Sequence, residues 1–182
     1  MNIPGIFVQN LIVEAVPILL FFLFLFRLGK NFQTEMYLKI TGKMQKCTVG
    51  ILGGILLALA LWCLVTKADK VTVLYNLLYY TVFIAFAEEF VVRGVCVYLV
   101  RGEKPYIRYL APNLLFAVMH LFSYANWGAI TVPYVISFVS SELLGLLTMG
   151  CIFQFLKEKS GTLWTAVLVH AILDYSVVLS YR

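Results

Sequence analysis

Two adjacent glutamates and an arginine interrupt a long apolar run between residues 71 and 100. They are Glu88, Glu89 and Arg93, in the segment AEEFVVRG. Ionisable side chains inside such runs are rare, face a protein interior or a water-filled cavity, and mark functional sites. The other ionisable residues within apolar runs, which include both histidines of the chain, are Glu14, His120, Glu142, His170 and Asp174. Carboxylates and imidazoles are groups that proteins use to activate water, so this set indicates hydrolytic chemistry.

Helical spacing separates the roles of the two glutamates. Glu89 and Arg93 are four residues apart, so they can form an ion pair on one helix face, with the glutamate in the favourable N-terminal position. Glu88 lies about 100° further round the helix and can point elsewhere. His170 and Asp174 are also four apart, so the carboxylate can accept the imidazole N–H and fix its tautomer. We therefore expect Glu89 and Arg93 to support a site in which Glu88 takes part.

Depth in the membrane gives an independent reason to group these residues. At ~1.5 Å of rise per residue, Glu88 and His120 lie ~18 Å from the basic ends of their expected helices. The same count places His170 at ~12 Å, Asp174 at ~18 Å and Glu142 at about 21 Å. Polar side chains from three helices would therefore meet near one plane, and Glu142 is close enough in depth to support them.

Such a cluster could activate water in two ways, through a general base or through a bound metal ion. Glu88, partly removed from water and beside His120, can take a proton from water as a general base. His170 and Asp174 can then stabilise the oxyanion of a tetrahedral intermediate. Alternatively, these four residues are ligands suited to Zn²⁺, which would activate the water itself. The residues leave both possibilities open; we favour no cofactor and retain Zn²⁺ as the alternative.

Composition fixes the elements that must position these residues. The chain has 182 residues, of which 62% are hydrophobic and 13% charged, with a mean hydropathy of +0.92. Soluble domains carry roughly 25% charged residues, so this is an integral membrane protein. Runs of roughly 20 apolar residues predict membrane-spanning helices. We expect an all-α, polytopic fold with about six spans, at 5–26, 47–66, 71–100, 109–124, 130–156 and 162–181.

The distribution of basic residues predicts the topology and explains the net charge of +5. Ten basic residues fall in the loops 27–46, 101–108 and 157–161, whereas the alternate loop and the C-terminus hold three. By the positive-inside rule the three basic loops are cytoplasmic and both termini lie outside. The lipid bilayer therefore accounts for the charge, and nucleic acid is excluded as a partner. We expect residues 1–182 to form a single integral membrane domain.

Three segments together resemble a known family. In order and spacing, EEFVVR at 88–93, FAVMH at 116–120 and HAILD at 170–174 are similar to the motifs of the CPBP family of intramembrane proteases. This family includes CAAX prenyl endopeptidases of the Rce1 type and bacterial Abi-like proteins. The resemblance covers about residues 71–181, which would be the catalytic core. It implies a conical polar active-site cavity among the last four spans, open toward the cytoplasm, in a short bacterial member of the plasma membrane.

The resemblance also implies roles for the motif residues. Glu88 and His120 would activate the water, His170 and the residue at 174 would form the oxyanion site, and the remaining motif residues, Glu89, Arg93 and Phe116, would support them. The family motif often ends in Asn, whereas this chain has Asp174. An ionised Asp cannot donate to an oxyanion, so Asp174 is expected to be protonated, to orient His170, or to bind a metal.

The leading functional prediction is an intramembrane endopeptidase that cleaves a membrane-associated peptide or protein, lipidated or inserted in the membrane. The resemblance offers peptide maturation and bacteriocin immunity as settings. A non-proteolytic immunity or scaffold protein is one alternative. A proton-coupled transporter is another, because intramembrane Glu, His and Asp also serve proton pathways. Transporters are often built from inverted repeats and broken helices, and the sequence shows neither.

Overall fold

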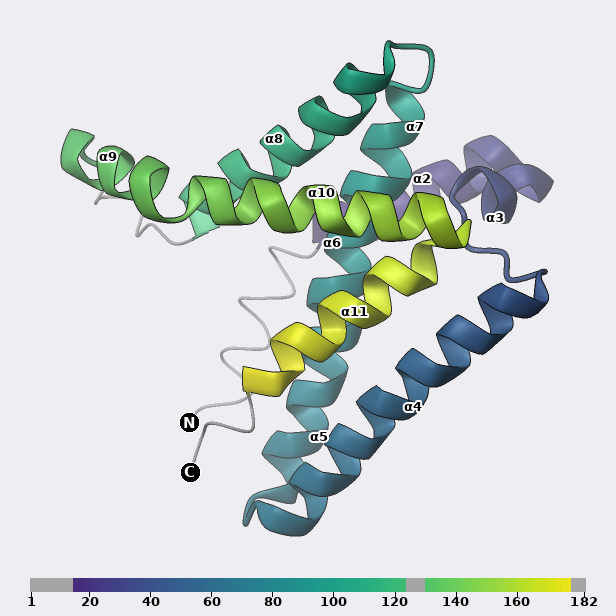
Figure 1. The fold of residues 1–182 in the computed structure, drawn as a ribbon, viewed down its shortest axis with the longest axis vertical. Helices are drawn as coiled ribbons and strands as arrows, with labels where there is room; N and C mark the ends of the chain where they lie inside the picture. Colours follow the sequence, from purple (N-terminus) through teal and green to yellow (C-terminus); the bar gives the residue numbers. More distant parts are fainter. Residues whose placement is uncertain (1–14, 124–129, 178–182) are drawn as a thin grey trace.

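The computed structural model describes residues 15–123 and 130–177, and all regular structure in these ranges is helical. The predicted all-α class is therefore confirmed for this part of the chain. The first helix, α2 (Ala15–Leu28), continues through a 3-10 turn, η1 (Gly29–Asn31), into the short helix α3 (Phe32–Glu35). The next helix, α4 (Lys43–Thr66), runs antiparallel to the segment that follows it (Figure 1). Glu14 lies outside the described residues.

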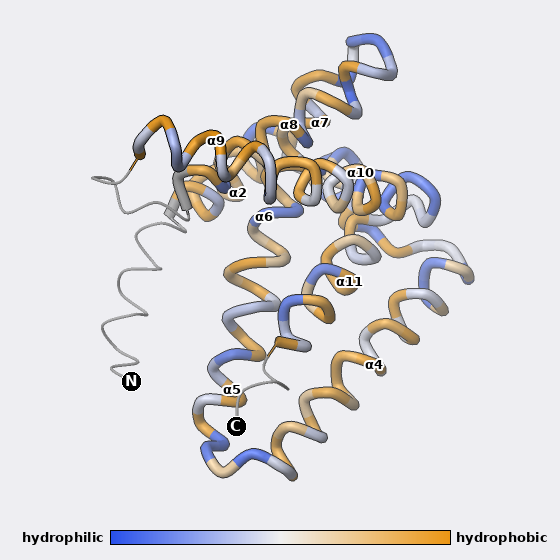
Figure 2. The backbone as a smooth tube through the Cα atoms, turned by 60° about the vertical axis from the view of Figure 1, so that its left-hand side comes forward, coloured by the Kyte–Doolittle hydropathy of each residue, from blue (hydrophilic) through white to orange (hydrophobic). Residues whose placement is uncertain are grey.

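The helix that carries the two glutamates is continuous from Lys70 to Leu99 but changes its winding. Asp69 begins it as N-cap, because one carboxylate oxygen accepts the Thr72 N–H at 3.0 Å and the other accepts the Thr72 hydroxyl. The α-helical part α5 (Lys70–Leu78) leads into a π-helix, and the successive segments are η2 (Tyr79–Phe86), α6 (Ala87–Glu89), the second π-helix η3 (Phe90–Cys96) and α7 (Val97–Leu99). Figure 2 shows a hydrophilic turn at α6 within a helix that is otherwise largely hydrophobic.

The last helix, α11 (Leu163–Ser176), packs between α4 and η2 (Figure 1). Its residues Leu163, Val167, Ala171 and Tyr175 recur every four positions and are fully buried, so they anchor one face of α11 in the core. This anchoring orients the neighbouring face, which carries His170, toward α6.

A second pair of helices covers the other side of α6 and η3. The helix α8 (Pro105–Ser123) packs along α10 (Leu143–Ser160), which follows α9 (Val132–Ser141). Thr131 caps α9 by accepting the Tyr134 N–H through its hydroxyl at 3.4 Å. The helices α9 and α10 meet at Glu142 and are bent by 45° there. Residues 113, 116 and 117 of α8 are buried, so this face of α8 points inward toward Arg93.

Two helices of the described residues are long and apolar enough to cross a membrane, Val16–Glu35 and Lys43–Thr66. A third would be added if the bent pair α9 and α10 is one span. Large apolar side chains are exposed along these helices, for example Phe26 at 82% and Val65 at 80%, as expected for surfaces that contact lipid. The protein is therefore an integral membrane protein, and the count of six spans stays a prediction.

Candidate active site

The ion pair predicted from helical spacing is present. Nη1 of Arg93 donates to Oε1 of Glu89 at 3.1 Å, and both side chains are fully buried. Charges in such surroundings are tolerated only when they are paired and hydrogen-bonded. Glu88 is on the adjacent position of α6 and keeps 29% of its side chain exposed. The two glutamates thus have different surroundings, as their angular separation on the helix requires.

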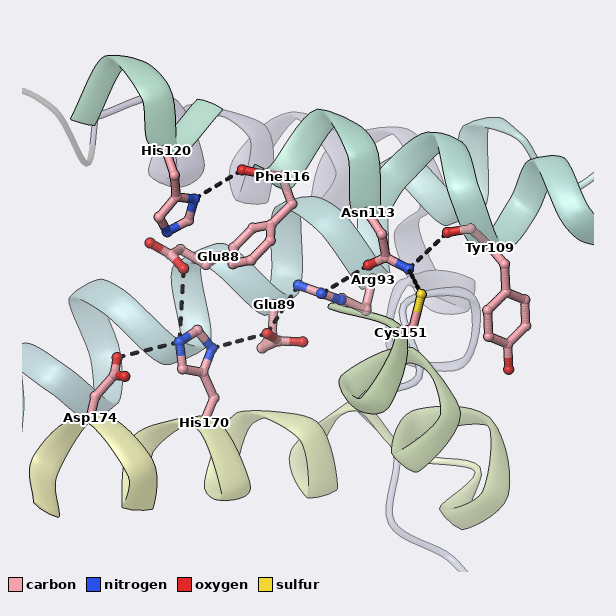
Figure 3. Close-up of polar contacts among 10 residues, drawn as sticks. All are labelled: Glu88, Glu89, Arg93, Tyr109, Asn113, Phe116, His120, Cys151, His170 and Asp174. Atoms are coloured by element: carbon pink, nitrogen blue, oxygen red, sulfur yellow. Dashed lines mark hydrogen bonds and ion pairs between the residues drawn. The ribbon is translucent and has the colours of Figure 1, made fainter. Parts of the chain in front are cut away.

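His170 is the centre of the cluster (Figure 3). Its Nδ1 lies 3.0 Å from Oε1 of Glu89, and its Nε2 lies 3.3 Å from Oδ2 of Asp174. Nε2 is also 3.9 Å from Oε2 of Glu88. Three carboxylates from two helices therefore surround one imidazole. The contact with Asp174 was predicted, whereas the contact with Glu89 was not.

The hydrogen-bond partners determine where the protons of His170 lie. Oε1 of Glu89 already accepts from Arg93, so Nδ1 of His170 is assigned as a second donor to the same oxygen. At the other side of the ring, Nε2 lies 3.3 Å from Oδ2 of Asp174, which is within ion-pairing distance. The assignment follows from the network of partners. Glu89, and not Asp174, thus fixes the Nδ1–H of His170.

His120 extends the cluster from α8. Its Nδ1 is 2.9 Å from the carbonyl oxygen of Phe116, and a carbonyl can only accept, so Nδ1 carries the proton. In the neutral ring Nε2 then carries the lone pair, so it can accept a hydrogen bond. Figure 3 shows the Glu88 carboxylate between the rings of His120 and His170, pointing toward both. The structure therefore brings together the four residues predicted to be catalytic, Glu88, His120, His170 and Asp174.

Aromatic rings enclose the charged groups. The Phe153 ring stacks on His170, with centroids 4.8 Å apart and an interplanar angle of 18°. The predicted supporting residue Phe116 makes an edge contact with His120, with ring centroids 4.4 Å apart. The Arg93 guanidinium lies 4.7 Å from the centroid of the Phe116 ring. A cation over an aromatic face is attracted by the ring quadrupole. Sequence reasoning missed Phe153, because a phenylalanine in an apolar helix carries no signal of a site.

Arg93 is itself fixed by α8 and α10. Its Nη2 donates to Oδ1 of Asn113 at 2.9 Å, and Nδ2 of Asn113 donates to the Tyr109 carbonyl at 2.7 Å. A Cβ atom at Gly150 would lie 2.7 Å from Oδ1 of Asn113 and 3.0 Å from Nη2 of Arg93. Only glycine therefore leaves room for this contact. Asn113 could have been identified from the sequence, because helical spacing puts it on the same face as Phe116 and His120.

The main chain at Arg93 has a further partner. Nζ of Lys157 donates to the Arg93 carbonyl oxygen at 2.8 Å, and the Lys157 side chain is buried against the Tyr37 ring, with Nζ 4.1 Å from its centroid. This contact joins the C-terminal end of α10 to the middle of η3. Lys157 was assigned from sequence to a basic loop, and its position 64 residues from Arg93 gives no local signal.

The structure does not bring Glu142 to the cluster. Glu142 is exposed at the bend between α9 and α10. Among the described residues, no hydrogen bond or ion pair connects its side chain with Glu88, His120 or His170. Its predicted supporting role therefore rests on depth alone.

The predicted Zn²⁺ alternative requires ligand atoms that converge on one point. Both ring nitrogens of His170 face carboxylates at hydrogen-bonding or ion-pairing distance, and Nδ1 of His120 is bound to a carbonyl. In the part of the chain that the structure describes, no three His, Cys, Asp or Glu side chains are arranged to surround a metal ion. The four residues thus do not fit the predicted Zn²⁺ alternative in this arrangement.

The fold and the site define a class, a helical membrane protein with a buried glutamate–histidine cluster at the junction of three helices. Comparison with protein families agrees. The family model described as type II CAAX prenyl endopeptidase Rce1-like matches residues 70–176, which is more than half of the chain. The chain therefore belongs to this Rce1-like protease family. Searches of curated proteins and of solved structures found no match.

Proposed function

We propose that the protein is an intramembrane endopeptidase that uses Glu88 to activate water. The observation that carries this proposal is the position of the half-buried Glu88 carboxylate between His120 and His170 (Figure 3). Membership of a protease family supports the same reaction class. The three residues come from three helices, so the cluster depends on the tertiary fold.

In the proposed reaction Glu88 takes one proton from water as the water oxygen attacks the carbonyl carbon of the peptide bond. Nε2 of His120 accepts a hydrogen bond from the same water and orients it. The C–N bond then breaks, and the proton on Glu88 passes to the leaving nitrogen. Atoms and charges balance without a further reactant.

His170 and Asp174 supply the oxyanion site in this proposal. Glu89 keeps a proton on Nδ1, so Nε2 is the nitrogen that faces the reacting groups. When Nε2 carries the proton shared with Asp174, it donates to the developing oxyanion. Asp174 accepts from Nε2 in the resting state and thereby orients the ring.

The family description names a prenyl endopeptidase, so the proposed substrate is a lipidated or membrane-inserted peptide. From the positive-inside rule applied to the basic loops, we propose that the site opens toward the cytoplasm and that the termini lie outside. A bacterial plasma membrane remains the proposed location.

The test compares the N-termini of peptides in membranes that contain the wild type with those that contain Glu88→Gln. Termini that disappear in Glu88→Gln and persist in the matched control Glu142→Gln, an exposed glutamate outside the cluster, are expected. Loss of the base should reduce cleavage about 100-fold or more. Identical peptides in all three membranes would contradict proteolysis and favour a binding role. Metal content and chelator sensitivity of the cleavage test for a metal separately.

A further inference from the structure

Two cavities adjoin on the side of the glutamate helix that faces α2. The first, of about 240 Å³, is lined entirely by apolar residues of α2, η2, α6 and η3, including Ile18 and Ala87. The second, of about 890 Å³, extends toward η1, α3 and the segment before α4. Phe21 and Phe86 line both cavities, with ring centroids 6.2 Å apart. The two cavities are therefore neighbours that share these two aromatic side chains in their walls.

The second cavity carries the polar groups. Its lining includes Lys30, Gln33 and Lys39, and no Asp or Glu is among the described residues that line it. The two lysines are exposed, so they can extend to meet a ligand. The cavity therefore attracts an anion, whereas the adjoining cavity accepts only an apolar chain.

The wall of the second cavity is fixed by α11. Tyr37 has φ of 56°, a left-handed conformation that costs of order 1–3 kcal/mol for a non-glycine residue. Its carbonyl oxygen accepts from the Leu163 N–H at 2.7 Å and from the Thr162 hydroxyl at 3.1 Å. Nε1 of Trp164 donates to the Leu38 carbonyl at 2.9 Å. These bonds stabilise the strained turn and fix the position of the backbone that leads to Lys39.

We propose that the two cavities form a binding site for one anionic phospholipid. Its phosphate lies at Lys30 and Lys39, and one acyl chain occupies the apolar cavity. Basic pockets between the helices of membrane proteins bind anionic headgroups in this way. The site is separate from the proposed peptidase chemistry, although Ala87 of the apolar cavity directly precedes Glu88.

The test uses the purified full-length chain in detergent. Native mass spectrometry measures the affinity for phosphatidylglycerol and for phosphatidylcholine with the same acyl chains. We expect phosphatidylglycerol to bind at least tenfold more tightly. The double variant Lys30→Gln/Lys39→Gln should remove this preference, whereas Lys43→Gln/Lys46→Gln, an equal loss of charge outside the cavities, should keep it.

Two further measurements identify the occupant. Ile18→Trp, which fills the apolar cavity, should weaken phosphatidylglycerol binding, and glycerol phosphate without acyl chains should not compete. If both double lysine variants lowered the preference for phosphatidylglycerol equally, the preference would come from general surface charge, and the proposal would be overturned. Competition by glycerol phosphate would show a site for free phosphate and overturn it as well. Binding of a farnesylated peptide that phosphatidylglycerol does not displace would assign the cavities to substrate and equally overturn it.

Discussion

Oε1 of Glu89 and Nδ1 of His170 are 3.0 Å apart, although the two residues are separated by 81 positions in the chain. The same oxygen accepts from Arg93 at 3.1 Å. One carboxylate oxygen therefore neutralises the buried arginine and sets the protonation of the histidine at the centre of the cluster. Glu89, which was predicted to be a supporting residue, is thus in direct contact with His170.

Replacement of Glu89 by Gln tests this double role. The amide oxygen can still accept from Arg93, but the buried guanidinium loses its counter-charge. We expect the free energy of unfolding in detergent micelles to fall by about 3–5 kcal/mol, the cost of an uncompensated buried charge. The exposed control Glu142→Gln should change it by no more than about 0.5 kcal/mol. A small effect of Glu89→Gln would mean that Arg93 is solvated.

A methyl group at position 150 should disturb Arg93 through Asn113. Gly150→Ala places a Cβ atom 2.7 Å from Oδ1 of Asn113, and overpacking of this kind costs about 1–3 kcal/mol. The smaller side chain of Asn113→Ser makes room, so the double variant should be more stable than the sum of the single changes predicts. Gly53→Ala is the matched control, because nothing lies within 4 Å of its added Cβ.

Asp174→Asn separates orientation from charge. An asparagine oxygen can accept from Nε2 of His170 as Asp174 does, and its amide can donate to an oxyanion. We expect the cleavage rate of Asp174→Asn to stay within tenfold of wild type, and that of Asp174→Ala to fall about 100-fold. Equal losses in the two variants, measured on the peptide found in the N-terminal comparison, would show that the negative charge itself is required.

The N-cap of the glutamate helix should respond to acid. The hydroxyl and backbone N–H of Thr72 lower the pKa of Asp69 below its usual value. The cap therefore stabilises the first turn of α5 above about pH 3.9, the unfolded value, and this stabilisation is lost as pH falls through the lowered pKa. The protection factor of the Val73 amide, which is the exchange rate corrected for its intrinsic pH dependence, should fall at low pH in the wild type. In Asp69→Asn, whose side chain caps the helix without ionising, this fall in protection at low pH should be absent.

The sequence predicted the contacts that depend on local geometry. Four-residue spacing on a helix was enough for Glu89 with Arg93 and for His170 with Asp174, and equal depth brought His120 to the same level. The contact between Glu89 and His170 was out of reach, because it depends on the rotation of α6 against α11. The role of Gly150 could not be predicted either, because the need for a glycine follows only from the positions of Asn113 and Arg93 around it.

Within the described residues the expected spans lie close to the observed helices, but depth counting alone supports the role predicted for Glu142. It treated 130–156 as one straight helix, whereas α9 and α10 are bent by 45° at that residue. The π-helical winding of η2 and η3 was also not predicted. A continuous apolar run has no periodic pattern from which a wider turn could be recognised.

These two π-helical stretches lie on either side of the Glu88–Glu89 turn. A π turn closes its hydrogen bond one residue later than an α turn. Each stretch therefore contains more residues than an α-helix needs to cover the same length. Deletion of one residue within η2 or η3 would be absorbed by a return to α-helical winding on that side. The flanking parts of the helix can therefore lose one residue without a break in the helix.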